Sequence, residues 1–238
     1  MKDEGHLRSL EPSGFTRLAL AQLTDQGVTA GGGQAPRVSV AAWSERVVNL
    51  PAGATHFGFV SEGTPVLSGR AGSFTLTPGM YFALPDGGSV GGGQGLLVSQ
   101  EGYCGFFHLG GPVEEQGRLC YIDGCTDSLL VPPVVKGDPC LNLLHVPPHT
   151  RQTPHTHPSL RVGFIVRGQG YCLTRYETVS LTTGDVFIIQ PGSRHSFHTE
   201  SCVLAIIAYH PDSDFGPTHE DHPMINRTTI EEQSGETP

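Results

Sequence analysis

The stretch "QTPHTHPSLRVGFIVRGQG", residues 152–170, joins two histidines to an apolar segment that ends in glycines. His155 and His157 are two residues apart, so their imidazoles face the same side of an extended chain. β-Branched and aromatic residues follow and lead into a glycine-rich turn at Gly168. The stretch therefore predicts a strand whose beginning carries two candidate metal ligands.

The rest of the chain favours an all-β protein. Its 238 residues include 32 glycines and 19 prolines, and many short apolar runs end at Gly, Pro, Asn or Asp. A chain of this length can bury a good core as one large domain or two small ones. The formal net charge of −9 argues against nucleic acid or an anionic membrane surface as a partner.

Location and partners follow from what the sequence lacks. No apolar run approaches the ~20 residues that a membrane span needs, and "MKDEGHLRSLEPSG" at the N-terminus has no apolar core of a secretory signal. The six cysteines are scattered, as expected of reduced thiols rather than a disulfide framework. We therefore expect a cytoplasmic protein that binds a small molecule, and a homodimer is possible.

The chain contains an internal repeat. "HFGFVSEG" at 56–63 resembles "RVGFIVRG" at 161–168, and "FTLTPGMYFALPDGGSV" at 74–90 resembles "VSLTTGDVFIIQPGSRH" at 179–195. Both pairs align without a gap at one offset of 105 residues, which predicts two copies of one β unit. The expected divisions are an N-terminal arm, a first copy, a connector with a short strand or helix, a second copy and a C-terminal tail, at 1–36, 37–115, 116–135, 136–212 and 213–238.

The two copies differ at their histidines. Ahead of the repeated segment at 56–63 and 161–168, the first copy is nine residues shorter. The missing stretch is the one that carries His155 and His157. Later, Val90 stands in the first copy where His195 stands in the second. Three histidines lost together indicate three histidines that act together. The first copy is therefore expected to bind no metal.

The spacing of the three histidines suits a metal site. His195 follows His157 by 38 residues, across a turn and an apolar strand, so an antiparallel partner strand could bring it opposite the first two. Imidazole is a common ligand of Fe, Zn, Cu, Ni and Mn. Three such ligands leave coordination positions open, as catalytic sites require. The sequence predicts one divalent ion per chain and leaves its identity open.

The second copy resembles the cupin superfamily. The first cupin motif, G-x5-H-x-H-x3-E-x6-G, is matched by His155, His157 and Gly168. The second, G-x5-P-x-G-x2-H-x3-N, is matched by Gly184, Gly192 and His195. The departures are His149, Arg161, Gln190 and Thr199, which replace the first glycine, the glutamate, the proline and the asparagine.

This resemblance implies a bicupin, with two tandem double-stranded β-helix (jelly-roll) barrels of which only the C-terminal one keeps metal ligands. Cupins with three histidines and no glutamate resemble thiol, β-diketone and gentisate-type dioxygenases, which use Fe(II) and O2. The resemblance thus implies an Fe(II)-type oxygenase for a small anionic or chelating substrate. A metal-dependent isomerase, cyclase or lyase and a non-catalytic ligand-binding module remain open. A transcription factor is not favoured, because the first 36 residues are too short and glycine-rich for a helix-turn-helix pair.

Arg161 shares the strand face of His157 by parity. A guanidinium cannot ligate a cation, so the protein ligands are expected to be neutral and to favour an anionic co-ligand. Arg161 either binds a substrate carboxylate bidentately or bends away to pair with an acid at the barrel rim.

Other residues receive weaker assignments from the pattern. Tyr171 is a candidate catalytic residue in the pocket, and Tyr176 or His149 could also supply acid–base function. We expect His198 to face solvent, and His219 and His222 to lie in a solvated tail or a lid. Predicted pocket-lining residues are Phe164 or Ile165, Tyr171, Phe187 or Ile188, and Ile206.

Overall fold

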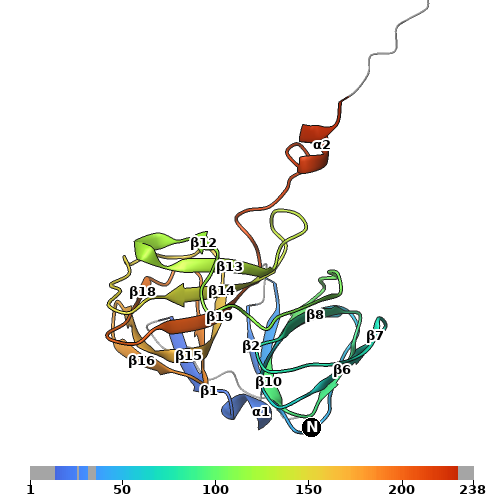
Figure 1. Ribbon diagram of the computed structural model, residues 1–238, viewed down its shortest axis with the longest axis horizontal. Helices are drawn as coiled ribbons and strands as arrows, with labels where there is room; N and C mark the ends of the chain where they lie inside the picture. Colours follow the sequence, from blue (N-terminus) through green and yellow to red (C-terminus); the bar gives the residue numbers. More distant parts are fainter. Residues whose placement is uncertain (1–13, 26, 32–35, 230–238) are drawn as a thin grey trace, which may run out of the picture.

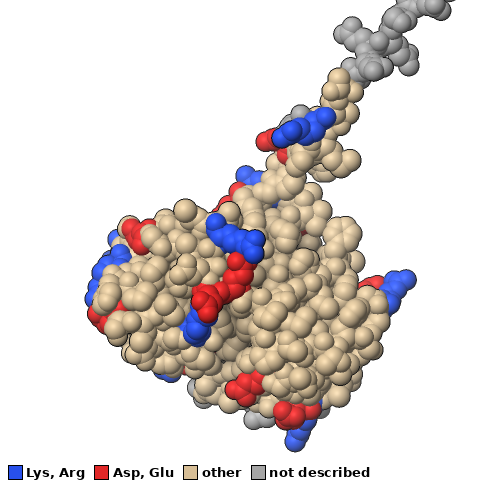
Figure 2. Space-filling model, viewed as in Figure 1, with Lys and Arg blue, Asp and Glu red and all other residues tan. Residues whose placement is uncertain are grey.

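The computed structural model describes residues 14–25, 27–31 and 36–229; most of the expected N-terminal arm and the end of the tail lie outside these ranges. Figure 1 shows two β-rich halves side by side, with the segment that carries α2 extending away from both. Neither helix of the described part is long and apolar enough to cross a membrane. Charged side chains of both signs are sparse and interspersed on the face that Figure 2 shows.

The elements that precede the connector are β1 (Phe15–Ala19), α1 (Gln22–Asp25), β2 (Val28–Ala30), β3 (Val38–Ser44), β4 (Val48–Leu50), β5 (Ala54–Glu62), β6 (Val66–Gly69), β7 (Gly72–Thr75), β8 (Tyr81–Pro85), β9 (Gly88–Gly91), β10 (Gln94–Glu101) and β11 (His108–Gly110). Those from the connector onwards are β12 (Leu119–Cys120), the 3-10 turn η1 (Ile122–Gly124), β13 (Thr126–Val131), β14 (Cys140–Val146), β15 (Arg161–Thr174), β16 (Thr178–Thr182), β17 (Asp185–Ile189), β18 (His195–His198), β19 (Leu204–His210) and α2 (Pro223–Arg227).

The C-terminal half is organised around the long strand β15. Its first part pairs with β17 and β19, and its second part pairs with β16 and β18. The complete path is β1-β17-β15-β19-β14-β13-β12. In the N-terminal half two shorter strands take the place of one long strand. β5 lies in the sheet β11-β8-β5-β10-β3-β2, and β6 lies in the sheet β4-β9-β6-β7. Both halves are therefore built from antiparallel strands, and the predicted all-β class is confirmed.

Strand register repeats at the offset seen in the sequence. Gly58 pairs with Phe82 in β5–β8, and Gly163 pairs with Phe187 in β15–β17, 105 residues further on in both strands. Each phenylalanine ring lies over its glycine, where a Cβ would come within 2.1 Å of the Phe82 ring or 2.0 Å of the Phe187 ring. The hairpins at the centre of the two halves therefore match residue for residue.

Turn glycines repeat as well. Gly63 and Gly168 have φ of 74° and 86°, and Gly79 and Gly184 have φ of 84° and 94°. These are left-handed conformations that a residue with a Cβ adopts at a cost. The sequence match between these glycines thus reflects a shared backbone requirement.

The sheets extend beyond the boundaries expected from the repeat. Strand β1, from the N-terminal arm, pairs with β17, and the Phe15 ring stacks on Phe187 at 5.3 Å. Strand β13, from the connector, pairs with β14. Both strands satisfy backbone groups at what would otherwise be sheet edges. They lie outside the repeated segments, so the repeat carried no information about them.

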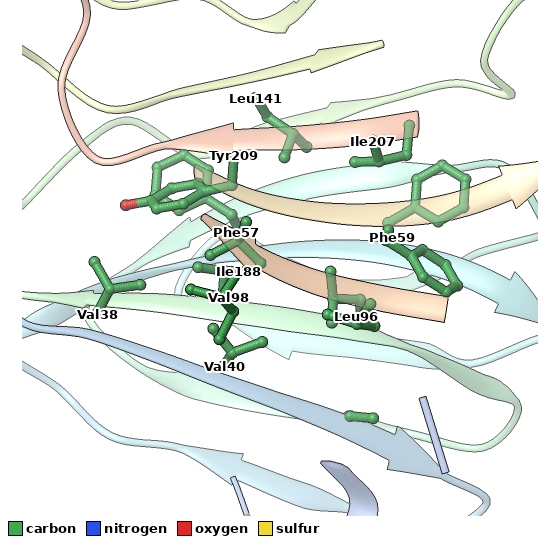
Figure 3. Close-up of a cluster of buried hydrophobic side chains, with 14 of the residues drawn as sticks. Val38, Val40, Phe57, Phe59, Leu96, Val98, Leu141, Ile188, Ile207 and Tyr209 are labelled. Carbon is green, nitrogen blue, oxygen red and sulfur yellow. The ribbon is translucent and has the colours of Figure 1, made fainter. Parts of the chain in front are cut away.

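The two halves share one apolar core. Aromatic rings meet across it, with centroids 5.0 Å apart for Phe57 and Tyr209 and 6.0 Å apart for Phe59 and Phe164. The Tyr209 hydroxyl donates a hydrogen bond to Gln100 of the other half. Figure 3 shows this cluster between the strands of both halves. Burying each such side chain contributes about 1.5–3 kcal/mol, so the halves stabilise one another.

Candidate metal centre

Three histidines converge at one end of the C-terminal half. His155 and His195 form an antiparallel bridge, with backbone N–O distances of 2.9 and 3.0 Å in the two directions. The carbonyl of His157 accepts a hydrogen bond of 2.8 Å from the backbone of Gly192. Ring centroids are 4.6–5.1 Å apart, and one ligand atom from each residue lies within 4.8 Å of the others. The structure thus brings together the three residues that the sequence grouped.

Backbone carbonyls orient two of these rings. The Nδ1 atom of His155 lies 2.9 Å from the carbonyl oxygen of Thr153, and Nδ1 of His195 lies 2.9 Å from that of Ser193. A carbonyl only accepts, so Nδ1 carries the proton in both rings and Nε2 keeps its lone pair. Metal-binding histidines are commonly held in this way. Both rings therefore present the tautomer that ligates through Nε2.

Burial favours the neutral form of two of the three histidines. Desolvation lowers the pKa of His157 to about 3, with further lowering from the charge of Arg161 and from the other two histidines. Desolvation likewise lowers the pKa of His195 to about 4, partly opposed by its bond to the Ser193 carbonyl. Both imidazoles are thus neutral near pH 7, which is the form that binds a metal.

The size of the cluster also fits an ion. Nitrogens bound to one divalent ion at about 2.0–2.1 Å lie at most about 4.2 Å apart. The observed spread of up to 4.8 Å is only slightly larger. Small side-chain rotations would close the difference, so the donor set fits one divalent ion with three neutral ligands.

Arg161 lies beside the histidines, with 6 % of its surface exposed. One guanidinium nitrogen donates to the Leu160 carbonyl at 2.9 Å and to the Ser159 hydroxyl at 2.5 Å, and Ser159 in turn donates to Asp212. Its Nε is buried without a partner. Burial lowers the pKa of Arg161, opposed by the charges of Asp212 and Asp214, yet a guanidinium remains charged near neutral pH.

Arg161 does not form the ion pair that one sequence interpretation expected. Among the described residues, no carboxylate oxygen lies within 4.0 Å of its nitrogens. Asp212 is reached only through the Ser159 hydroxyl. The positive charge therefore remains at the wall of the cavity.

The cavity has a volume of about 350 Å³ and mostly apolar walls. Phe187 and Ile206 line it, as predicted, whereas Phe164, Ile165 and Ile188 are buried in the core without lining it. The other apolar wall residues of this half are Leu129, Leu144, Val162, Ile189, Phe197 and Ala208.

Several wall residues were missed in the sequence. Leu119, Cys120 and Tyr121 come from the connector, and Phe215 comes from the tail. Neither segment has a counterpart in the repeat. His210 also lines the cavity, with its ring centroid 6.4 Å from that of His157. Strand parity could have revealed His210, because it lies four residues after Ile206 on the same face of β19.

The structure places Tyr171 outside this cavity. Its ring stacks on His198 with centroids 5.2 Å apart, the Arg151 guanidinium lies 5.8 Å from its centroid, and its hydroxyl donates to Glu200 at 3.3 Å. Counting alternate residues along β15 fails because the register shifts between Ile165 and Arg167. The expectation that Tyr171 acts from the pocket wall is therefore corrected.

The other histidines are placed as follows. His198 is buried at 7 % exposure, with Nε2 2.8 Å from the Ser196 hydroxyl, so the expectation that it faces solvent is wrong. Stacking under Tyr171 explains its burial. His149 is exposed in a left-handed turn with φ of 60°. His222 caps α2 through Ile225, so it serves the tail helix.

Comparisons with known proteins show a similarity to a ligand-binding family and to cupin structures. Residues 137–216 match the family described as the AraC-like ligand binding domain. No curated protein matches the sequence. Among solved structures, the protein Ylba from E. coli is 14 % identical with a TM-score of 0.63, covering 90 % of this chain and 97 % of its own.

Two further structures resemble most of the chain. A cupin 2 conserved barrel domain protein from Leptotrichia buccalis is 10 % identical with a TM-score of 0.61, and the match covers 83 % of this chain and 96 % of that one. Salicylate 1,2-dioxygenase from Pseudoaminobacter salicylatoxidans, in adducts with gentisate, is 12 % identical with a TM-score of 0.62, covering 88 % and 83 %. At these identities the likeness concerns the fold alone.

Proposed function

We propose that this protein is a metal-dependent cupin enzyme, an Fe(II)-type oxygenase for a small anionic or chelating substrate. His155, His157 and His195 hold one divalent ion, and Arg161 binds the anionic group of the substrate. The observation that carries the proposal is the convergence of three imidazoles beside a buried guanidinium whose Nε has no partner among the described residues.

The chain's own residues prepare the site for an anion. Three neutral ligands leave the charge of a divalent ion uncompensated, and Arg161 adds another positive charge. Desolvated charges interact more strongly than charges in water, so the apolar walls strengthen the attraction for a carboxylate or enolate. When bound, the ion would supply Lewis-acid or redox chemistry at its open positions.

Size and a structural neighbour support this substrate class. A cavity of about 350 Å³ falls at the lower end of the range for small-molecule sites. Gentisate, named in the dioxygenase structure with a similar fold, is an aromatic acid. We propose a substrate of comparable size, with its acid group at Arg161 and its apolar part against residues such as Phe187 and Ile206.

The N-terminal half is proposed to be a second cupin barrel without a metal. At the position equivalent to His195, Val90 is fully buried. Both ring nitrogens of His56 are occupied, with Nδ1 2.7 Å from the Ser99 hydroxyl and Nε2 2.8 Å from the Pro51 carbonyl oxygen. Its ring therefore has no free lone pair in the direction of a metal.

The test begins with metal analysis of protein purified without chelators or a histidine tag. The protein is then loaded anaerobically with Fe(II), and O2 uptake is measured with small aromatic and thiol-containing carboxylates. We expect one metal ion per chain and substrate-dependent O2 uptake. Turnover without O2 would assign a non-redox reaction, and a chain that binds none of the tested metals would refute the proposal.

A second candidate function is a ligand-binding module without turnover. The match of residues 137–216 to the AraC-like ligand binding domain favours it. The same experiment separates the two candidates, because a binding module would bind a carboxylate in calorimetry without consuming O2 or forming product.

A further inference from the structure

The connector contributes an unusual residue close to the metal centre. Asp123, in the turn η1, has φ of 56° and ψ of 34°, a left-handed conformation for a residue with a Cβ. Its carboxylate accepts two hydrogen bonds from Thr153, one from the backbone N–H at 2.5 Å and one from the hydroxyl at 3.2 Å. A side chain 30 residues away thus holds the loop that carries the first histidines.

Thr153, held by Asp123, in turn orients the ring of a metal-site histidine. Its carbonyl accepts the Nδ1–H of His155 at 2.9 Å. Pro154 follows, and a residue before proline is restricted to extended conformations. With its N–H and hydroxyl held by Asp123 and its backbone restricted by Pro154, Thr153 has little freedom to turn its carbonyl away. The direction of the His155 ring therefore depends on the Asp123 carboxylate.

The same turn also contacts the preceding residue of the loop. Gln152 is buried at 1 % exposure, and its side-chain nitrogen lies 3.7 Å from the sulfur of Cys125. Its side-chain oxygen accepts the backbone N–H of Phe197 at 3.0 Å. Two consecutive loop residues are therefore held by one connector turn, Gln152 on the buried side and Thr153 on the exposed side.

The His195 ring is oriented without a contact from the connector. The Ser193 carbonyl that holds its Nδ1 belongs to a local turn, in which the Ser193 N–H donates to the Gln190 carbonyl at 3.1 Å. The equivalent carbonyl for His155 lies in a loop with no such turn of its own and is held by the connector. The two rings have the same hydrogen bond but different supports.

We propose that Asp123 is a positioning residue for the metal centre, which orients His155 through Thr153 so that Nε2 faces the ion. This inference rests on the proposed metal site. It gives the connector a role in the affinity of the site beyond linking the two halves.

The chain offers a matched set of variants. Asp123→Gly removes the carboxylate while tolerating a positive φ, and Asp123→Asn keeps one acceptor oxygen without the charge. Asp86→Gly is the control, because Asp86 is also an exposed aspartate with a positive φ, 68°, and its carboxylate pairs with Arg70 at 3.3 Å in the other half. Denaturant unfolding of the metal-free variants shows whether each one folds.

Zn²⁺ affinity is measured by competition with a chromogenic chelator. We expect Asp123→Gly to weaken Zn²⁺ binding about 10-fold, at the lower end of the 10–100-fold range for partners of metal ligands. Asp123→Asn should weaken it less, and Asp86→Gly should leave it unchanged. Wild-type Zn²⁺ affinity in a folded Asp123→Gly variant would overturn the inference.

Nitrogen NMR of the metal-free protein separates this inference from the proposed function. The wild type should show His155 protonated at Nδ1, and Asp123→Gly should show a mixture of tautomers with at least about 10-fold faster amide exchange at Thr153, a loss of about 1.4 kcal/mol of protection. If the wild type binds no Zn²⁺ but these changes occur, the metal site fails and the orienting role of Asp123 stands. If neither signal changes in Asp123→Gly, the orienting role fails whatever the metal does.

Discussion

The two halves of the molecule share a hairpin but differ at the place where metal ligands would lie. Val90 in one half and His195 in the other are both almost fully buried, at 0 % and 1 % exposure. One packs as a hydrophobic side chain, and the other keeps a lone pair facing two further histidines. The comparison teaches that the strand framework tolerates either residue. The site is an addition to the framework, supplied mostly by the longer loop of 152–157.

The largest effect is expected when the metal-site histidine of one half is replaced by the residue of the other half. His195→Val introduces the residue that the N-terminal half has at the equivalent position. We expect metal content to fall to near zero, because two imidazoles hold a divalent ion much more weakly than three. The fold should persist, as judged by circular dichroism and unfolding. Undiminished metal in the folded variant would show that the three-histidine site is wrong.

Arg161 is the next difference to test. Arg161→Met should leave metal content unchanged and weaken the binding of a carboxylate ligand by about 10–100-fold, as expected for the loss of a charged hydrogen-bond donor worth about 1.5–3 kcal/mol. Calorimetry with the metal-loaded protein measures this effect. Arg175→Met is the control, because Arg175 is exposed and contacts Tyr176 outside the cavity. Equal affinity in both variants would make Arg161 a structural residue.

The shared hairpin can be tested in parallel in both halves. Gly58→Ala and Gly163→Ala each place a Cβ about 2 Å from the ring of the facing phenylalanine, so each should lower the free energy of unfolding by about 1–3 kcal/mol. Chemical denaturation measures both. Similar losses would support two equivalent barrels, whereas a large loss in only one half would show that the repeat does not extend to packing.

The last expected effect is a pH dependence of stability to which two histidines of the metal centre contribute. The pKa values of His157 and His195 are lowered from 6.5 to about 3 and about 4, so the unfolded chain binds more protons than the folded one below pH 6.5. The metal-free protein should therefore lose stability as the pH falls from about 6.5 to about 4.

Denaturant unfolding at several pH values measures this slope. His195→Val should reduce it, because one of the histidines with a lowered pKa is removed. His219→Gln should not, since His219 is exposed in the tail. An unchanged slope in His195→Val would show that His195 is not the source of the dependence.

Sequence alone was sufficient for the features that depend on local chemistry. Short apolar runs between glycines and prolines predicted an all-β chain, and left-handed turns explain why Gly63 and Gly168 align. The loss of three histidines from one copy identified a group that the structure brings within 4.8 Å. These inferences succeeded because turn geometry and side-chain alternation act over a few residues.

Tertiary structure alone decided which distant segments complete the site. The pairing of β1 with β17 and of β13 with β14 is set by sheet edges left open by the repeat, and neither segment resembles its partner. Parity misplaced Tyr171, because a register shift in β15 turns the later residues to another face. The bond from Asp123 to Thr153 depends on how the connector crosses the end of the sheet. Such contacts arise from chain packing between residues far apart in sequence, and no local pattern encodes them.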